Sequence, residues 1–182
     1  MENLYAWNKY HTFLGKLGAV EVDVKIYQLT ILQEIFARHK NLRVRNAFEV
    51  AKAAHKGQVD KGGVDYIYHP MTVAFQCDGN DSAVIVALLH DVVEDTNFTF
   101  EDLQEKIPLT DEELQALKLL THDKNISYFD YVKKIKSNEL AAQVKLADLK
   151  NNSDLSRIPE KLRTEKDFKC VEKYKAAMKI LQ

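Results

Sequence analysis

The stretch AVIVALLHDVVEDT, residues 83–96, decides the fold of this chain. Its first half, 83–89, is apolar on every side, which is typical of a helix buried at the centre of a domain. Directly after this run the sequence changes to histidine and acidic residues. We therefore expect a central buried helix that delivers a polar cluster at its carboxyl-terminal end.

Four ionisable residues of this stretch, His90, Asp91, Glu94 and Asp95, fall within two helical turns. His90 and Glu94 are four residues apart and share a helix face. Three carboxylates and a histidine placed so closely are costly to desolvate unless a cation compensates them. An exposed acidic helix end is the alternative, but the apolar run before the cluster argues against it. The pattern favours a metal site.

Two further segments supply matching ligands. The first, residues 54–70, contains His55 and His69, and the second contains Asp148, which interrupts the apolar face of VKLADL, residues 144–149. Two imidazoles and two carboxylates form a donor set that suits Mn²⁺, Fe²⁺ or Mg²⁺ and leaves positions open for water and substrate. Closed zinc sites more often use thiolates, and Cys77 and Cys170 lie far apart with no paired motif around them.

The remainder of the chain predicts helices and almost no strand. Three prolines and six glycines are too few for a turn-rich β-sandwich, and residues 168–181 show the spacing of an amphipathic terminal helix. Residue pairs resembling capping boxes at helix starts are Asn46 with Glu49, Thr110 with Glu113, and Thr164 with Asp167. We expect an all-α protein, a compact helical bundle over residues 46–182, with an N-terminal helical extension over residues 1–45. The aromatic residues at its start, Tyr5, Trp7, Tyr10 and Phe13, are expected to pack on the domain.

The charge balance restricts the class of partner. Lys+Arg 26 against Asp+Glu 27 gives a net charge of -1, without the basic footprint that nucleic-acid binding normally leaves. The N-terminus lacks a basic stretch followed by an apolar run, so no signal peptide is predicted. The longest apolar run, 83–89, is far too short to span a membrane. We expect a cytoplasmic protein, and we do not expect it to bind nucleic acid or a membrane.

Taken together, these segments resemble the HD phosphohydrolase superfamily and, more narrowly, the hydrolase domain of RelA/SpoT-type enzymes and their small single-domain relatives. The matching stretches are AHKGQ (54–58), DYIYHP (65–70), ALLHDVVEDT (87–96), LTHDK (120–124) and VKLADLKNN (144–152). The resemblance implies an HD-domain fold and Mn²⁺-dependent removal of pyrophosphate from the 3′ position of the alarmones guanosine tetra- and pentaphosphate (ppGpp and pppGpp). Long members also carry a synthetase domain, for which 182 residues leave no room, so synthesis is not expected.

Carried over position by position, the resemblance gives roles to individual residues. Glu94 and Asp95 correspond to the residues that orient the attacking water and assist proton transfer. Asn152 corresponds to a contact with the substrate sugar or phosphates, Lys61 lies near the nucleotide base, and Tyr66 belongs to the same pocket wall. The implied metal ligands are His69, His90, Asp91 and Asp148.

Two positions depart from the family pattern. The family usually has Arg-Lys where this chain has Asp60-Lys61, and a carboxylate cannot stack on a purine as a guanidinium does. Leu155 stands where long members often carry a small hydroxyl residue. Both departures leave the base of the substrate open. His55 matches the family but is absent from its metal set, so we expect it to support a ligand or to pack.

Other functions therefore stay open beside ppGpp hydrolysis. The substrate could be an adenosine alarmone or a nucleotide with a 2′- or 3′-phosphate, and the product, pyrophosphate or orthophosphate, separates the two kinds of reaction. A catalytically idle module that binds nucleotide is a hypothesis of another class, against which the intact set of histidines and carboxylates argues. The chain could also act as the antidote of a toxic synthetase. That partner, the oligomeric state and the role of residues 1–45 are not decided by the sequence.

Overall fold

The computed structural model describes residues 21–182, with side chains described from residue 29 onward. Within this part of the chain the structure is helical, and an isolated antiparallel bridge between Val59 and Asp65 is its only β-pairing. The all-α prediction is confirmed. The helices are α2 (Glu21–Ala37), α3 (Leu42–Ala54), α4 (Tyr68–Gln76), α5 (Asp81–Leu89), α6 (Val92–Asp95), α7 (Phe100–Lys106), α8 (Asp111–Leu120), α9 (Tyr128–Lys136), α10 (Glu139–Ser153) and α11 (Glu165–Leu181), with 3-10 turns η1 (Leu155–Arg157) and η2 (Glu160–Leu162) before α11.

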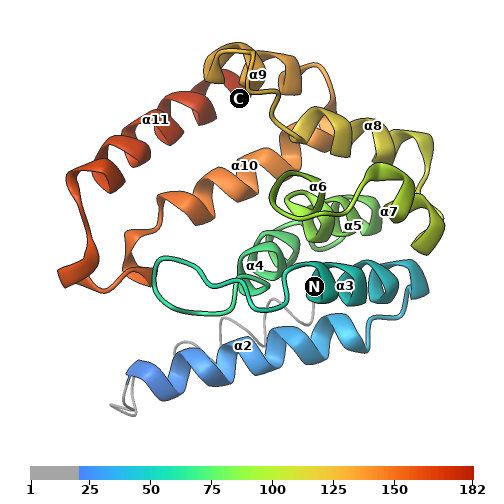
Figure 1. Cartoon of the computed structure of the whole chain (residues 1–182), viewed down its shortest axis with the longest axis horizontal. Coiled ribbons are helices and arrows are strands. Elements are labelled where there is room, and N and C mark those ends of the chain that lie inside the picture. Colours follow the sequence, from blue (N-terminus) through green and yellow to red (C-terminus); the bar gives the residue numbers. More distant parts are fainter. Residues whose placement is uncertain (1–20) are drawn as a thin grey trace.

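Helix α5 lies at the centre of the domain, as predicted. All residues from Ala83 to Leu89 are buried, and α5 packs against α3, α4, α8 and α10. Helix α10 runs through the middle of the view in Figure 1 and also contacts α4, α8, α9 and α11. Because α4, α5 and α10 pack on one another, the polar residues that they carry are held close together.

Local capping explains where several helices begin. Capping boxes are present at the starts of α8 and α11, as predicted. The helix start predicted at Asn46 is wrong, because Asn46 lies inside α3. That helix begins earlier, since the side chain of Asn41 accepts a hydrogen bond from the backbone N–H of Arg43 at 2.9 Å.

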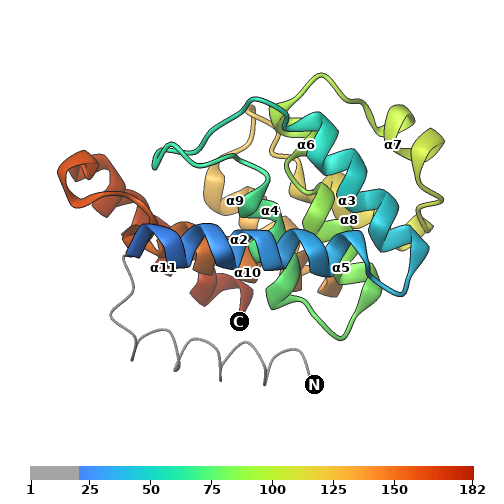
Figure 2. The same cartoon turned by 90° about the horizontal axis from the view of Figure 1, so that it is seen from below.

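The described part of the predicted N-terminal extension joins the same core as the rest of the domain. Helix α2 packs against α3 and α4 and lies lengthwise across one face of the molecule in Figure 2. Its residues Leu32 and Phe36 are 3% and 2% exposed and belong to the core. The predicted packing of aromatic residues concerns positions that lie outside the described residues. None of the described helices is long and apolar enough to cross a membrane.

Candidate metal centre

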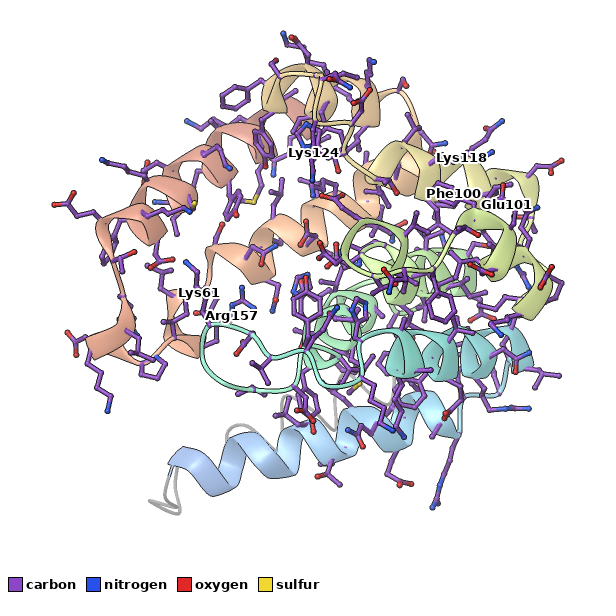
Figure 3. The ribbon with its side chains drawn as sticks, in the orientation of Figure 1. Lys61, Phe100, Glu101, Lys118, Lys124 and Arg157 are labelled. Atoms are coloured by element: carbon purple, nitrogen blue, oxygen red, sulfur yellow. The ribbon has the colours of Figure 1, made fainter. Side chains whose placement is uncertain are left out.

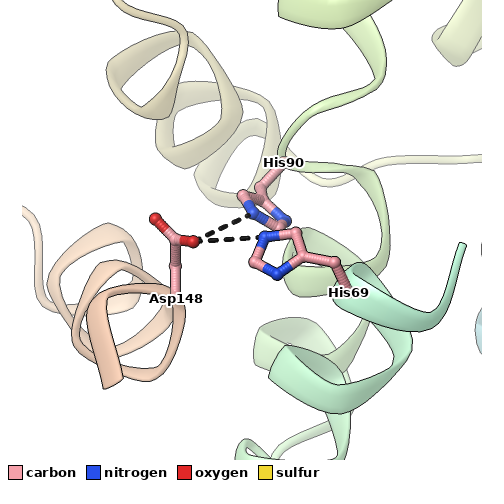
Figure 4. A group of neighbouring side chains, drawn as sticks. All are labelled: His69, His90 and Asp148. Atoms are coloured by element: carbon pink, nitrogen blue, oxygen red, sulfur yellow. Dashed lines mark ion pairs between the residues drawn. The ribbon is translucent and has the colours of Figure 1, made fainter. Parts of the chain in front are cut away.

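Three helices bring together a buried group that could hold a metal ion. His69 lies in the first turn of α4, His90 directly follows α5, and Asp148 lies in α10. One ligand atom from each lies within 4.8 Å of the other two, and Figure 4 shows the three side chains facing one another. The Asp148 Oδ1 atom is 3.2 Å from Nε2 of His69 and 3.8 Å from Nε2 of His90.

Asp91 completes the set of ligands predicted from the sequence. Its Oδ2 atom lies 3.4 Å from Nε2 of His69 and 3.2 Å from Nε2 of His90. The hydroxyl of Tyr66 donates to the same oxygen at 2.7 Å. Asp91 thus lies beside both histidines, although among the described residues the group whose ligand atoms are all mutually close contains only His69, His90 and Asp148.

The hydrogen bonds of the two histidines show that these residues fit a metal ion. Nδ1 of His90 lies 2.7 Å from the backbone oxygen of Ala87, and Nδ1 of His69 lies 2.7 Å from Oδ1 of Asn151. Because both partners are acceptors, each Nδ1 must carry the donated proton, which leaves Nε2 with a lone pair. The buried Nε2 of His90 has no hydrogen-bond partner among the described residues. The lone pair of each Nε2 and the carboxylate oxygens that it faces repel each other unless a cation lies between them.

Without a metal, protons take the place of that cation. Burial lowers the pKa of His69, but hydrogen bonds with Asp148 and Asp91 outweigh burial and raise the pKa to about 10. The pKa of His90 is also raised, by the Asp91 and Asp148 carboxylates against the effect of burial. Burial opposes ionisation of Asp91 and Asp148, yet neighbouring cationic groups, His90 for Asp91 and Lys145 for Asp148, hold both pKa values below the ordinary range. The site is built to bind positive charge.

Two residues that support the ligands were missed in the sequence. The Nζ atom of Lys145 lies 2.8 Å from Oδ2 of Asp148, so one carboxylate oxygen faces the histidines while the other binds an ammonium. Asn151 orients His69 as described above. A signal for Asn151 was present, because it is three residues after Asp148 and so shares its helix face. The role of Lys145 depends on the burial of its side chain, which is 15% exposed.

The predicted catalytic carboxylates lie beside the cluster on the short helix α6. Oε2 of Glu94 accepts the backbone N–H of His122 at 2.9 Å, which fixes an otherwise exposed side chain. The Tyr66 hydroxyl, 2.7 Å from Asp91, lies 3.3 Å from Oδ2 of Asp95. Burial and the charge of Asp91 raise the pKa of Asp95. Tyr66 therefore joins a predicted ligand to a predicted catalytic group.

The residues predicted to contact substrate are placed differently from one another. Asn152 donates through Nδ2 to Oδ1 of Asp148 and so lies at the cluster. Lys61 is 60% exposed, and its ammonium pairs with Asp167 at the start of α11. Figure 3 shows Lys61 close to Arg157, beside the loop that connects α3 with α4. The structure thus brings Asn152, but not Lys61, into contact with the predicted ligands.

His55 lies next to this site without joining the ligand group. It is 2% exposed, its ring centroid is 5.0 Å from that of Tyr66, and its Nδ1 lies 2.8 Å from Oε1 of Gln58. The amide of Gln58 in turn donates to the backbone oxygen of Asp95 at 3.0 Å. These contacts agree with the packing role expected from the sequence.

Comparison with known proteins shows which curated proteins this chain resembles in sequence. Over 96 residues the chain is 35% identical to a guanosine-3′,5′-bis(diphosphate) 3′-pyrophosphohydrolase of Aquifex aeolicus, covering 51% of this chain and 13% of the relative. Over 78 residues it is 36% identical to the bifunctional (p)ppGpp synthase/hydrolase SpoT of Escherichia coli, covering 41% of this chain and 11% of the relative. The chain thus spans 13% or less of the length of these two relatives. No protein-family model matches it.

A solved structure shares the fold. It is that of a metazoan ortholog of SpoT, described as hydrolyzing ppGpp and playing a role in starvation responses, with a TM-score of 0.61 at 23% identity over 80% of this chain and 86% of that chain. The helical bundle shares the fold of that structure, and its buried group of His69, His90 and Asp148 lies where α4, α5 and α10 meet. Over the matched residues the chain is similar in sequence to RelA/SpoT-type hydrolases, which confirms the resemblance found in the sequence.

Proposed function

We propose that this protein is a metal-dependent phosphohydrolase that releases pyrophosphate from the 3′ position of ppGpp or pppGpp. The observation that carries the proposal is the convergence of the ligand atoms of His69, His90, Asp91 and Asp148, with both Nδ1 atoms already bound elsewhere. We assign these residues as metal ligands. Mn²⁺ suits the mixed nitrogen and oxygen donors, as do Fe²⁺ and Mg²⁺. The names of the relatives supply the substrate.

The proposed hydrolase domain covers residues 46–182, and residues 1–45 are its helical extension. The boundary falls inside α3 (Leu42–Ala54), and the core positions of Leu32 and Phe36 support packing of the described part of the extension on the domain. We propose hydrolysis without synthesis, in the cytoplasm. A role as the antidote of a toxic synthetase is compatible with this activity, because an antidote of this kind needs only to hydrolyse the nucleotide that the synthetase makes.

The chain contributes positioning and proton transfer to this reaction. A bound divalent ion would supply Lewis acidity toward a phosphoryl oxygen and toward water. Glu94, fixed by the backbone of His122, and Asp95 are assigned to orient the attacking water. The raised pKa of Asp95 suits it to accept a proton from that water, because proton transfer is most efficient when the pKa of the acceptor approaches the working pH. Asn152 and Tyr66 hold Asp148 and Asp91 in place.

A second candidate function is the same chemistry on another nucleotide. Asp60 favours it, because its Oδ1 accepts the backbone N–H groups of Gly62 and Val64 at 2.8 and 3.0 Å. A carboxylate occupied in this way holds the loop and is not a platform on which guanine can stack. An adenosine alarmone or a nucleotide with a 2′- or 3′-phosphate is the alternative substrate.

The test is Mn²⁺-dependent release of pyrophosphate from ppGpp, measured beside its adenosine counterpart and a 3′-nucleotide. Rapid release of pyrophosphate from ppGpp is the expected result. Turnover of another nucleotide in its place would retain the chemistry and change the substrate. Binding of metal and nucleotide with no turnover of any compound would contradict the proposal in favour of a binding module.

A further inference from the structure

Arg157, the last residue of η1, connects the metal centre with the loop 57–66. Its Nη2 donates to Oδ1 of Asn152 at 2.9 Å, and its Nη1 lies 3.8 Å from Oδ2 of Asp60. The amide of Asn152 donates at its other end to Asp148. The guanidinium is thus separated from a proposed metal ligand by one amide side chain. Figure 3 shows Arg157 beside Lys61 at this edge of α10.

The position of this guanidinium is fixed from two sides. The Asp60 carboxylate is held by its own loop, because Oδ1 accepts the N–H groups of Gly62 and Val64. The same loop also touches the backbone of η1, since a Cβ atom added at Gly62 would lie 2.7 Å from the carbonyl oxygen of Arg157. The carboxylate of Asp60 is therefore held in place where it faces the guanidinium of Arg157. Asn152 holds the guanidinium from its other side, at Nη2.

The guanidinium has capacity left for a ligand. Of its five N–H donors, one is used on Asn152, while the buried Nε has no partner among the described residues. The Asp60 contact at 3.8 Å is too long for a hydrogen bond. The side chain is 30% exposed. By contrast, the neighbouring cation of Lys61 is hydrogen-bonded to Asp167. Because the side chain is partly exposed, the remaining N–H groups of Nη1 and Nη2 are available to an anionic acceptor, and such charge-assisted hydrogen bonds are strong.

We propose that Arg157 binds a phosphate group of the substrate beside the metal centre, and that Asp60 is the positioning residue that holds its guanidinium there. The planar fork of arginine matches the oxygens of a phosphate in two parallel hydrogen bonds. The inference rests on the proposed function for the identity of the substrate. Binding at Arg157 itself requires no more than a phosphate group. The inference also gives Asp60 a role other than contact with the base.

The first test compares Arg157→Gln and Arg157→Lys with the wild type in ppGpp hydrolysis. We expect KM to rise about tenfold or more in Arg157→Gln, as for loss of a charged hydrogen bond, while kcat changes far less. Arg157→Lys restores part of the affinity, because it keeps the charge and loses the fork. Arg38→Gln is the matched control, since Arg38 directly follows α2, is 82% exposed, and among the described residues forms an ion pair with Glu34 alone. An unchanged KM in Arg157→Gln would overturn the proposal.

The positioning role of Asp60 is tested by a double-mutant cycle. We expect Asp60→Asn to raise KM in the wild-type background and to have no further effect in Arg157→Gln, because Asp60 acts through the guanidinium. A merely structural role would lower Tm equally in both backgrounds and leave KM unchanged. Independent, additive effects of the two substitutions on KM would overturn the positioning role.

A binding measurement separates this inference from the proposed function. Inorganic pyrophosphate is titrated calorimetrically into the Mn²⁺-loaded wild type, Arg157→Gln and Arg157→Lys, each checked for folding by its thermal melt. Weaker binding to Arg157→Gln, partly restored in Arg157→Lys, supports the inference even if ppGpp is not hydrolysed, in which case the proposed function alone fails. Equal affinity for the wild type and Arg157→Gln overturns the inference even if ppGpp is hydrolysed.

Discussion

The metal centre and the loop 57–66 lie side by side but are built in different ways. The four proposed ligands stand on or beside α4, α5 and α10, which pack together in the core. The loop is held by contacts nearer the surface, from Asp60 to Arg157 and from the 60% exposed Lys61 to Asp167. On the proposed function we expect the core to determine metal binding, and the loop residues Asp60 and Lys61, which do not contact the ligands themselves, to influence substrate binding.

Replacing a proposed ligand should have the largest effect. We expect His90→Ala and Asp148→Ala each to lose bound Mn²⁺ and about a thousandfold or more of kcat/KM, because several kcal/mol of charge stabilisation depend on the ion. Metal content and steady-state kinetics measure the outcome. Tight Mn²⁺ binding retained by either variant would contradict the assignment of ligands. It would also contradict the claim that the core residues, and not the loop, hold the metal.

Loss of a residue that supports a ligand should have a smaller effect. Asn151→Ala removes the acceptor that orients His69, and such substitutions typically cost about 10- to 100-fold in metal affinity. Calorimetric titration of Mn²⁺ measures it. Lys150→Ala is the matched control, because Lys150 is exposed on the same helix. Equal affinities of the two variants would show that the Asn151 contact does not hold the ligand.

The stability of the metal-free protein should fall as the pH rises above about 6.5, the ordinary pKa of histidine. The pKa of His69 is raised to about 10 in the folded state, so its stabilisation is complete below about pH 6.5 and is lost progressively as the pH rises toward 10. The lowered pKa values of Asp91 and Asp148 contribute stability that persists throughout this range. We expect the difference in Tm between Mn²⁺-loaded and metal-free protein to widen from about pH 6.5 to 8.5, because metal and protons compete for the same atoms. A constant or narrowing difference, measured by thermal melts, would contradict this linkage.

Changing the partner of Lys61 should have the smallest effect. Asp167→Asn weakens the ion pair that holds Lys61, and pairs with an exposed partner contribute little. We expect KM to change by less than about threefold and kcat to stay the same. Steady-state kinetics at two salt concentrations measure both. A tenfold change in KM would show that Lys61 contributes as much to substrate binding as Arg157 does, and that the surface contacts of the loop are not minor.

The central helix and the clustering of the four ligands could be predicted because their signals are local. An apolar run followed by HDVVEDT marks a buried helix with a polar end. Asp148 stands out by interrupting an apolar face. The roles of these residues stay predictions, but their convergence in space is observed.

The surroundings of the ligands could not be predicted, because they depend on contacts between distant segments. Lys61 and Asp167 are 106 residues apart in the sequence, and nothing local distinguishes Arg157 from a solvated surface residue. The start of α3 was misplaced because Asn41 competes with Asn46 for the role of cap, and only the structure shows which one accepts the backbone N–H.

The most direct test of the central claim is a titration of metal-free protein with Mn²⁺ in which bound metal and pyrophosphate release from ppGpp are followed together. The account predicts that activity rises in proportion to bound Mn²⁺ and saturates with it, and that the His90→Ala variant shows neither binding nor release. Pyrophosphate release by metal-free protein, or by His90→Ala at the wild-type rate, would contradict it.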